Sequence, residues 1–334
     1  MKRKLNIRPN TVAILTTNQC TAKCDICCFN CSPTKKEKMP LDLQRKIIVE
    51  AAKLPNIDTV GFSGGEPFLV FDEIIEMSSL AKKYGLRVIC TSNGFWGTSE
   101  ARALELLSKF KANGLVKLSL SCDLHHAQYV DVKKIKNVLK ACYKINLPVD
   151  IGSVITKSTA DLSTVFSELK EEMINVPHYT AACLPVGSAE KEISENEYFH
   201  DPYIFERCNV CYETTYYAVF PNGDVYPCCS QAGATPPLKL GNVNEISMKE
   251  VEQNYNANIH IRIMKKYGIN WYLEKANNLE YNTFFEKEFV NKCHLCREIF
   301  SDAKFMTLVI PYLEEEKRKI YEKYLECLRE KSAV

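Results

Sequence analysis

The stretch Cys20-Thr-Ala-Lys-Cys24-Asp-Ile-Cys27-Cys28-Phe-Asn-Cys31 lies directly after an apolar, β-branched run, Thr11–Thr17. Its first three cysteines are separated by three and then two residues. Thiolates at this spacing can bind three corners of a cubic iron–sulfur cluster, because a short loop wraps around it and leaves the fourth iron without a protein ligand. The stretch therefore predicts a cluster site with one open coordination position.

The same spacing resembles the CxxxCxxC signature of radical S-adenosylmethionine (radical SAM) enzymes. The resemblance implies that Cys20, Cys24 and Cys27 hold a [4Fe–4S] cluster whose open iron binds SAM, and that the cleavage of SAM yields a 5′-deoxyadenosyl radical. A second interpretation pairs Cys24 with Cys27 and Cys28 with Cys31 as a tetrahedral zinc knuckle. The sequence that follows favours the cluster, and Cys28 and Cys31 stay unassigned.

A glycine-rich turn, Gly64-Gly-Glu-Pro67, directly follows the short strand pattern Asp58–Ser63. Glycines at the end of a strand let the backbone approach a ligand closely, and a glutamate supplies an acceptor for an ammonium group. In radical SAM enzymes the GGEP turn contacts the amino group of SAM. The resemblance therefore implies a set of SAM-binding residues, namely Ser63, Gly64, Gly65, Glu66 and Pro67.

Strand patterns alternate with amphipathic helices up to about residue 183. The expected strands are Thr11–Thr17, Asp58–Ser63, Leu86–Ser92, Val116–Cys122, Val149–Ile155 and Tyr179–Cys183, and the expected helices are Leu41–Lys53, Phe71–Tyr84, Ser99–Lys111, Val132–Ile145 and Asp161–Met173. Such alternation predicts parallel strands with right-handed crossovers. The resemblance implies an α/β fold, a partial (β/α)6 TIM-type barrel.

Active sites of such barrels lie at the C-terminal strand ends, which places several polar residues on the site rim, namely Asn93, Asp123, His125, His126 and Lys157. By analogy with the family, Ser121 and Asp123 face the SAM ribose or the substrate, which makes Asp123 a candidate catalytic residue. Asn93 and Ser121 are candidate cofactor-binding residues.

A second cysteine region begins at Cys208-Asn-Val-Cys211 and contains a hairpin signal at Pro221-Asn-Gly223, then Cys228 and Cys293-His-Leu-Cys296. Its pattern resembles the auxiliary cluster domain called SPASM or, in a shorter form, twitch, a small α+β iron–sulfur domain. The resemblance implies a second, auxiliary [4Fe–4S] cluster ligated by Cys228, Cys293, Cys296 and either Cys208 or Cys211. A two-CxxC zinc ribbon is the alternative.

The chain thus divides into a barrel (1–188), a linker (189–207), an auxiliary domain (208–300) and a C-terminal helix (301–334). Its 334 residues include 43 basic and 41 acidic ones, for a net charge of +2, which gives no electrostatic case for nucleic acid or anionic membrane as a partner. Without a signal peptide or a transmembrane run, the 16 cysteines indicate reduced thiols in the cytoplasm.

Four further stretches resemble radical SAM peptide epimerases of the epipeptide type, namely Cys27–Thr34, Ser92–Gly97, Asp123–His126 and Tyr226–Ser230. The resemblance implies a ribosomally made precursor peptide as substrate and an electron donor such as flavodoxin or ferredoxin as partner. A radical that removed and returned the same hydrogen would change nothing, so a second hydrogen source must act on the opposite face of the Cα atom. Cys229, next to Cys228, is the candidate thiol donor.

Two alternatives remain open at this point. One is formation of a thioether or carbon crosslink in the peptide, and the other is a zinc or iron–sulfur module for binding or electron transfer, without SAM turnover. Because only ten residues precede the first strand, the peptide leader is expected to bind the barrel edge, the auxiliary domain or a separate protein.

Overall fold

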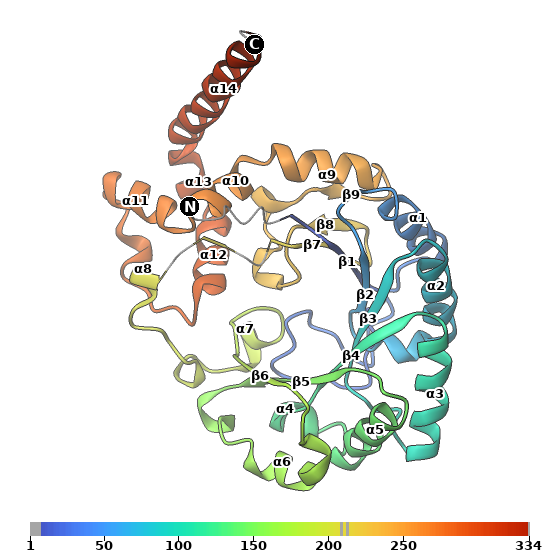
Figure 1. Ribbon diagram of the computed structural model, residues 1–334. Coiled ribbons are helices and arrows are strands. Elements are labelled where there is room, and N and C mark those ends of the chain that lie inside the picture. Colours follow the sequence, from blue (N-terminus) through green and yellow to red (C-terminus); the bar gives the residue numbers. More distant parts are fainter. Residues whose placement is uncertain (1–7, 208–209, 212–213, 333–334) are drawn as a thin grey trace.

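The structure, a computed structural model, describes residues 8–207, 210–211 and 214–332. Its centre is a nine-stranded sheet in the order β6-β5-β4-β3-β2-β1-β7-β8-β9 (Figure 1). The first six strands are parallel, namely β1 (Thr11–Leu15), β2 (Thr59–Ser63), β3 (Arg87–Ser92), β4 (Leu115–Ser121), β5 (Val149–Ile155) and β6 (His178–Ala182). This confirms the expected partial (β/α)6 barrel, with strand ends within one or two residues of those predicted.

Amphipathic helices cover the outer face of these strands, and Figure 1 shows them as an arc around the sheet. They are α1 (Leu41–Ala51), α2 (Phe71–Lys83), α3 (Glu100–Ala112), α5 (Val132–Lys144) and α6 (Ser163–Leu169). In α5 the buried positions Ile135, Val138, Leu139 and Cys142 recur every three or four residues, so one face of the helix packs on the sheet. A one-turn helix that the sequence patterns did not predict, α4 (Leu124–Ala127), follows β4.

The region after residue 208 extends the barrel sheet. β7 (Tyr216–Val219) and β8 (Asp224–Tyr226) form the hairpin predicted around Pro221-Asn-Gly223, and β9 (Gly241–Asn242) pairs with β8. β7 runs parallel to β1, so it attaches the hairpin directly to the first barrel strand. The hairpin and the barrel therefore share one sheet, and the domain boundaries given above remain predictions.

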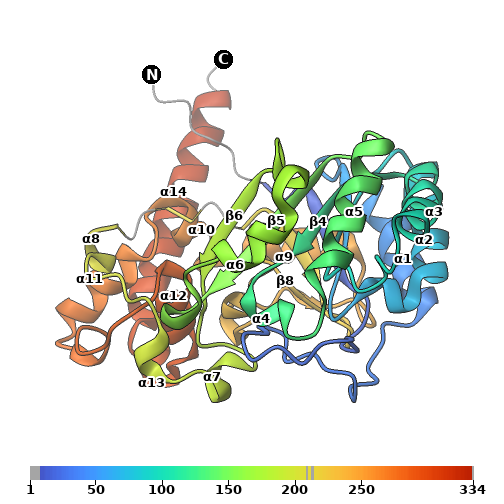
Figure 2. The same ribbon diagram turned by 90° about the horizontal axis from the view of Figure 1, so that it is seen from below.

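Helices dominate the rest of the chain. The segment predicted as a linker contains α7 (Ala189–Glu192) and α8 (Ile204–Arg207). Beyond the hairpin lie α9 (Met248–Ala257), α10 (Ile259–Lys266), α11 (Asn270–Asn278), α12 (Lys292–Ser301), α13 (Ala303–Leu308) and α14 (Ile310–Ser332). The far end of α14 projects from the body of the molecule (Figures 1 and 2). Within the described residues, no helix combines the length and apolar character needed to cross a membrane.

Candidate active site

Backbone hydrogen bonds join the glycine turn after β2 to the start of the cysteine loop. The Gly65 N–H donates to the Thr17 carbonyl (2.6 Å) and the Glu66 N–H donates to the Gln19 carbonyl (2.9 Å). A Cβ atom at Gly65 would lie 2.0 Å from the Gln19 carbonyl oxygen, and Gly64 has a φ of +128°. Glycine is therefore required at both positions. The turn and the loop form one unit at the C-terminal ends of β1 and β2.

The Glu66 side chain is fully buried and links the ends of β2 and β3. Its carboxylate accepts hydrogen bonds from the Ser92 hydroxyl (2.9 Å), the Asn93 N–H (2.8 Å) and the Phe68 N–H (3.0 Å). Burial raises the pKa of Glu66 to about 7, against the effect of these hydrogen bonds. Glu66 thus positions the strand end that carries Asn93, and a contact of Glu66 with the SAM ammonium group stays a prediction.

Asn93 contacts the cysteine loop directly. Its amide nitrogen donates to the Thr21 hydroxyl (3.0 Å) and lies 3.6 Å from the Cys20 sulfur, within reach of a weak hydrogen bond. The side chain is 6% exposed, so this contact is shielded from bulk water. The residue expected from sequence at the site rim therefore lies beside one of the three expected cluster ligands.

The pKa values of the loop thiols are shifted in opposite directions. Burial raises the pKa of Cys20 to about 11 and raises the pKa of Cys24 further, whereas hydrogen bonding from Cys31 lowers the pKa of Cys27 to about 6. A bound cation deprotonates coordinating thiols, so the raised values describe the loop before it binds iron. Cys31, left unassigned from sequence, supports Cys27 through its backbone N–H, 3.3 Å from the Cys27 sulfur.

Asp123 is fully buried at the start of α4 and joins β4 to β5. It accepts hydrogen bonds from the backbone of His125 (3.0 Å) and Val154 (2.9 Å) and from the His126 ring nitrogen Nδ1 (2.9 Å). Burial alone would raise the pKa of Asp123, but the hydrogen bond and charge of His126 lower it overall. The same pairing raises the pKa of His126 against its own burial. The hydrogen-bonded Asp123–His126 pair therefore stabilises this rim, and the predicted contact of Asp123 with ribose or substrate stays a prediction.

Two aromatic side chains from the rim hold the far side of the cysteine loop. The His125 ring binds the Asp25 carboxylate (2.7 Å) through Nδ1 and the Thr159 hydroxyl (3.0 Å) through Nε2. The Tyr129 hydroxyl donates to the Lys23 carbonyl (2.7 Å). Sequence reasoning placed His125 on the rim but missed Asp25 and Tyr129, because nothing local in the sequence indicates partners about 100 residues away.

The sheet face away from the covering helices has free space around Gly152. Strand register places Ser121 opposite Gly152 and Val154 opposite Ala181, so these residues share the face opposite to the helix-covered core. A Cβ atom at Gly152 would meet nothing within 4 Å. Ser121, expected as a SAM-binding residue, therefore lies on a face with room for a ligand.

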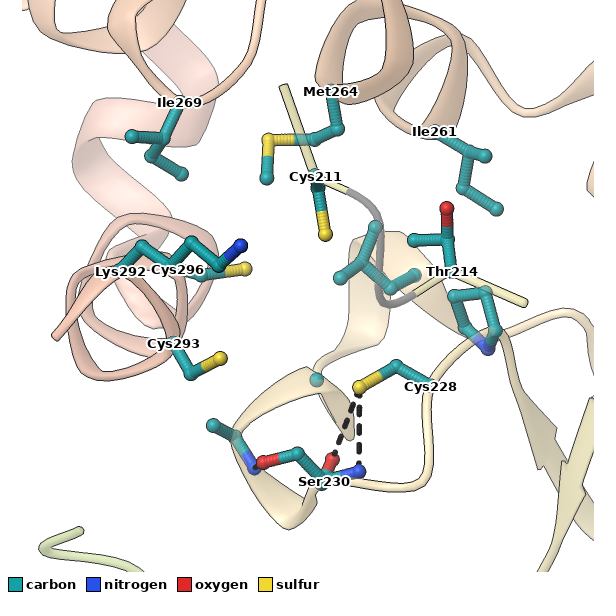
Figure 3. A pocket seen from close by; sticks show the side chains of 14 residues that line it. Cys211, Thr214, Cys228, Ser230, Ile261, Met264, Ile269, Lys292, Cys293 and Cys296 are labelled. Atoms are coloured by element: carbon teal, nitrogen blue, oxygen red, sulfur yellow. Dashed lines mark hydrogen bonds between the residues drawn. The ribbon is translucent and has the colours of Figure 1, made fainter. Parts of the chain in front are cut away.

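Four cysteines of the second region line one cavity (Figure 3). Cys293 and Cys296 lie one turn apart on α12, Cys228 follows β8, and Cys211 lies before β7. Figure 3 shows their sulfur atoms pointing into a common space. Burial and the neighbouring thiolates Cys229, Cys293 and Cys211 raise the pKa of Cys228 well above its usual value. Of the two candidates for the fourth ligand, Cys211 lines the cavity, and Cys208 lies outside the described residues.

Cys229 lies between the two cysteine sites. It follows β8, whose hairpin contacts the cysteine loop through the rings of Phe29 and Phe220 (centroids 5.8 Å apart, 75° between planes). Cys229 is close enough to Cys28 for its thiolate charge to raise the pKa of Cys28, after the larger effect of burial. The Cys229 residue itself is exposed. An exposed thiol thus lies beside the loop that carries Cys27.

The donor sets of both sites fit iron–sulfur clusters. Each offers only thiols, the ligand type that such clusters require, and the second cavity is otherwise lined mainly by apolar side chains such as Leu238, Ile261 and Met264. Across the described ranges, no three His, Cys, Asp or Glu side chains converge on the position of a single metal ion. In a cluster each cysteine binds a different iron, so the ligands need not meet at one point.

Comparison with known proteins agrees with this assignment. The sequence profile of the radical SAM superfamily matches residues 14–159, and that of the SPASM iron–sulfur cluster-binding domain matches residues 208–297. The chain is a radical SAM protein with a SPASM domain. The family therefore brings a SAM-binding [4Fe–4S] cluster, SAM and auxiliary iron–sulfur ligation to the chain, as expected from the cysteine motifs.

One relative of this radical SAM protein is YydG of Bacillus subtilis (strain 168), which is named for peptide biosynthesis. It is 29% identical over 309 residues, which cover 91% of this chain and 96% of YydG. Native anSMEcpe with bound AdoMet has a similar fold, with a TM-score of 0.58 and 17% identity over 92% of this chain and 99% of that one. A second structure of anSMEcpe, with AdoMet and the Cp18Cys peptide, matches with the same TM-score. At this identity the two structures support the fold alone.

Proposed function

We propose that this radical SAM protein matures a ribosomally made precursor peptide by converting L-residues to D-residues, with Cys229 as the hydrogen-atom donor. The similarity to a peptide biosynthesis protein, and the peptide held by a structure of the same fold, support a peptide substrate. The observation that carries the epimerase proposal is the exposed Cys229 thiol between the two cysteine sites.

In this proposal the loop thiols of Cys20, Cys24 and Cys27 hold the first cluster, and the cavity thiols of Cys211, Cys228, Cys293 and Cys296 hold the auxiliary one. When bound, the first cluster and SAM supply a 5′-deoxyadenosyl radical that removes a hydrogen atom from a peptide Cα. The Ser63–Pro67 turn, Asn93 and Ser121 form the wall against which SAM lies. Asp123, buried and paired with His126, acts as a positioning residue for this wall.

Cys229 determines the stereochemical outcome. A hydrogen atom returned by a thiol on the opposite face of the carbon gives the mirror-image residue, and a thiol is a good hydrogen-atom donor. Giving up that atom leaves a thiyl radical on Cys229, and one electron from a donor such as flavodoxin or ferredoxin together with one proton from solvent restores the thiol. Because Cys229 is exposed, solvent deuterium should replace its proton before each turnover.

The test is anaerobic turnover in heavy water with the cognate precursor peptide, followed by mass spectrometry and chiral amino-acid analysis. We expect one deuterium per D-residue and no other mass change. A loss of two hydrogens would instead identify a crosslinking enzyme.

The variant Cys229→Ala should retain the formation of deoxyadenosine and lose D-residues by about a hundredfold or more, because no thiol then lies on the opposite face. The matched control is Cys142→Ala, which removes a thiol buried in α5, away from both cysteine sites. Formation of D-residues at the normal rate by Cys229→Ala would exclude Cys229 as the donor.

A further inference from the structure

The strand β6 is an open edge of the sheet. It pairs with β5 on one side and is the last strand in the sheet order (Figure 1). Tyr179, Thr180 and Ala181 at its centre are all exposed. An edge of this kind presents unpaired backbone donors and acceptors to any extended chain nearby.

The hydrogen-bond pattern identifies which backbone groups are free. The Pro177 carbonyl accepts a hydrogen bond from the Ile151 N–H, and the Cys183 N–H donates one to the Ile155 carbonyl. The backbone N–H and C=O groups of the odd-numbered residues therefore point toward β5. In a parallel ladder the alternate residues, His178, Thr180 and Ala182, point away from it. Within the described part of the chain, the backbone of Thr180 has no hydrogen-bond partner on that side.

The features that usually protect such an edge are missing from β6. Its sequence, His-Tyr-Thr-Ala-Ala, contains no lysine, no proline and no other formally charged side chain at neutral pH. The exposed side chains on it are small, apart from that of Tyr179, which is 61% exposed. A strand can therefore approach the edge without meeting a charge or a bulky obstacle near Thr180.

An apolar hollow lies at the beginning of β6, which we call the β6 hollow. It is lined by Leu139, Tyr143, Ile174, Val176 and Tyr179, among other residues. Tyr143 is 86% exposed and Ile174 is 67% exposed. Exposed apolar side chains around one hollow are typical of a surface that binds a partner.

Seven charged side chains line the β6 hollow; six of them form ion pairs with one another, and the seventh is the exposed Glu171. Lys117 pairs with Asp150 (2.5 Å), Lys140 pairs with Glu172 (3.6 Å), and Lys144 pairs with Glu100. Since six of these charges have partners, the hollow offers mainly apolar contact, with the Glu171 carboxylate at its rim. Its occupant should therefore present apolar or aromatic side chains.

The other end of β6 leads to the cysteine loop. Cys183, the residue after β6, is 2% exposed and packs in one cluster with Ala22, Cys24 and Ile26 of the loop. A chain aligned along β6 would thus begin at the hollow and end beside the candidate active site. This continuity favours a long, extended ligand that reaches from the hollow into the site. A peptide substrate is such a ligand.

We propose that the β6 edge docks an extended segment of the precursor peptide, which pairs with the backbone of Thr180 and places apolar side chains in the β6 hollow. This inference rests on the proposed function, because it assigns that peptide its binding surface. The peptide adds a strand to the sheet, so main-chain hydrogen bonds supply affinity and the hollow supplies preference for sequence.

The first experiment measures binding without turnover. The probe is a fluorescein-labelled synthetic copy of the peptide that serves as substrate in the turnover test, titrated into the reconstituted protein without reductant. Hydrogen exchange of the same complex should show slower exchange at the Thr180 and Ala182 amides. Unchanged exchange at both amides on saturation with peptide would overturn the proposal. Protection of these amides already in the free protein, together with a dimer in light scattering, would instead assign the edge to a second copy of the chain.

The second experiment uses Thr180→Pro, with Thr180→Ala as its matched control. Proline removes the outward N–H and adds a ring on that side but breaks no bond to β5, and an edge strand tolerates such a proline. We expect about tenfold weaker peptide binding for Thr180→Pro and less than about twofold for Thr180→Ala. Equal affinities for the two variants would overturn the proposal, with circular dichroism checking that both are folded.

A substitution in the β6 hollow tests the apolar contact separately. Ile174→Ser should weaken binding about fivefold, whereas Tyr84→Ser, at the end of α2 and also exposed, should leave it unchanged. Docking and the proposed function can fail independently. Protection of the β6 amides without any D-residue would refute epimerisation alone, and normal D-residue yields with unaltered binding by Thr180→Pro would refute docking alone.

Discussion

The two cysteine sites of this protein are built in opposite ways. The three expected ligands of the first site, Cys20, Cys24 and Cys27, lie within eight consecutive residues of one loop. The four thiols of the second site come from three separate segments, with 85 positions between Cys211 and Cys296. The first site is therefore defined by local sequence, and the second by the packing of the segment after β8 against α12.

This difference explains how each site is supported. The cysteine loop is held from outside by the ends of several strands, through Gly65, Asn93, His125 and Tyr129. The second site is held by contacts within its own segments, such as the hydrogen bond that Cys228 accepts from the Ser230 N–H (3.2 Å) and the one that the Cys293 N–H donates to Asn291 (2.9 Å). A bound cluster would itself join the segments of the second site, because metal ligation closes the long stretch of chain between them.

The largest expected effect is at the glycine turn. In Gly65→Ala the added Cβ atom would meet the Gln19 carbonyl, so the cysteine loop must move away from the β2 end. A shift of about 1 Å at a reacting centre can cost about a hundredfold in rate, and we expect at least that loss of deoxyadenosine formation. Iron should fall from about eight to about four per chain, because only the auxiliary cluster survives.

The matched control for this change is Gly152→Ala. The same methyl group is added on a barrel strand, where nothing lies within 4 Å of it. Iron content should then stay normal, which separates the clash at Gly65 from the mere addition of a methyl group. A Gly65→Ala protein with full iron and full SAM cleavage would show that the turn does not position the loop.

A smaller effect is expected from Cys211→Ala. Because the cavity then keeps only three thiols, the auxiliary cluster should be lost and iron should again fall to about four per chain. SAM cleavage should persist, because the loop site is unchanged. Iron analysis, deoxyadenosine formation and chiral analysis of the peptide measure the three outcomes. The comparison variant is Cys208→Ala, which should keep both clusters; loss of iron there and not in Cys211→Ala would reverse the assignment.

The contrast between the two cysteine sites also shows which features of the fold and of the candidate site could be predicted from the sequence. The barrel strands, their helices and the cysteine loop were predicted within one or two residues at most ends, because periodicity and a compact motif are local signals. The choice between Cys208 and Cys211 could not be made, since it depends on how the chain before β7 meets α10, where the Cys211 N–H binds the Met264 carbonyl (3.1 Å). The partners of Glu66 and Asp123 were equally hidden, because they come from neighbouring strands.

The attachment of the hairpin to β1 is another feature that local patterns could not supply. Pro221-Asn-Gly223 predicted the turn, but the parallel pairing of β7 with β1 joins residues about 200 positions apart. That pairing brings Cys229 to the cysteine loop. The position of the proposed donor thus depends on long-range sheet register rather than on its own motif.

The smallest effect concerns charge at the rim of the first site. Asp123→Asn removes the carboxylate that pairs with His126 and should lower the free energy of unfolding by about 3 kcal/mol at pH 6, the usual cost of breaking a buried pair. The folded-state pKa of Asp123 is lowered, so its stabilisation is present above its unfolded value near 4. The folded-state pKa of His126 is raised, so its stabilisation is complete below about pH 6.5 and is lost as pH rises through the folded value.

Stability measured by denaturant should therefore differ most between wild type and Asp123→Asn at about pH 5–6, and the difference should shrink toward pH 9, where His126 is neutral. Asp131→Asn is the matched control, because Asp131 also caps a helix, through the Lys133 N–H (2.8 Å), but is exposed. Its effect should stay below about 1 kcal/mol and show little change between pH 6 and 9. A pH-independent difference for Asp123→Asn would mean that its hydrogen bonds to the backbone, rather than the charge of His126, hold the β4 and β5 ends together.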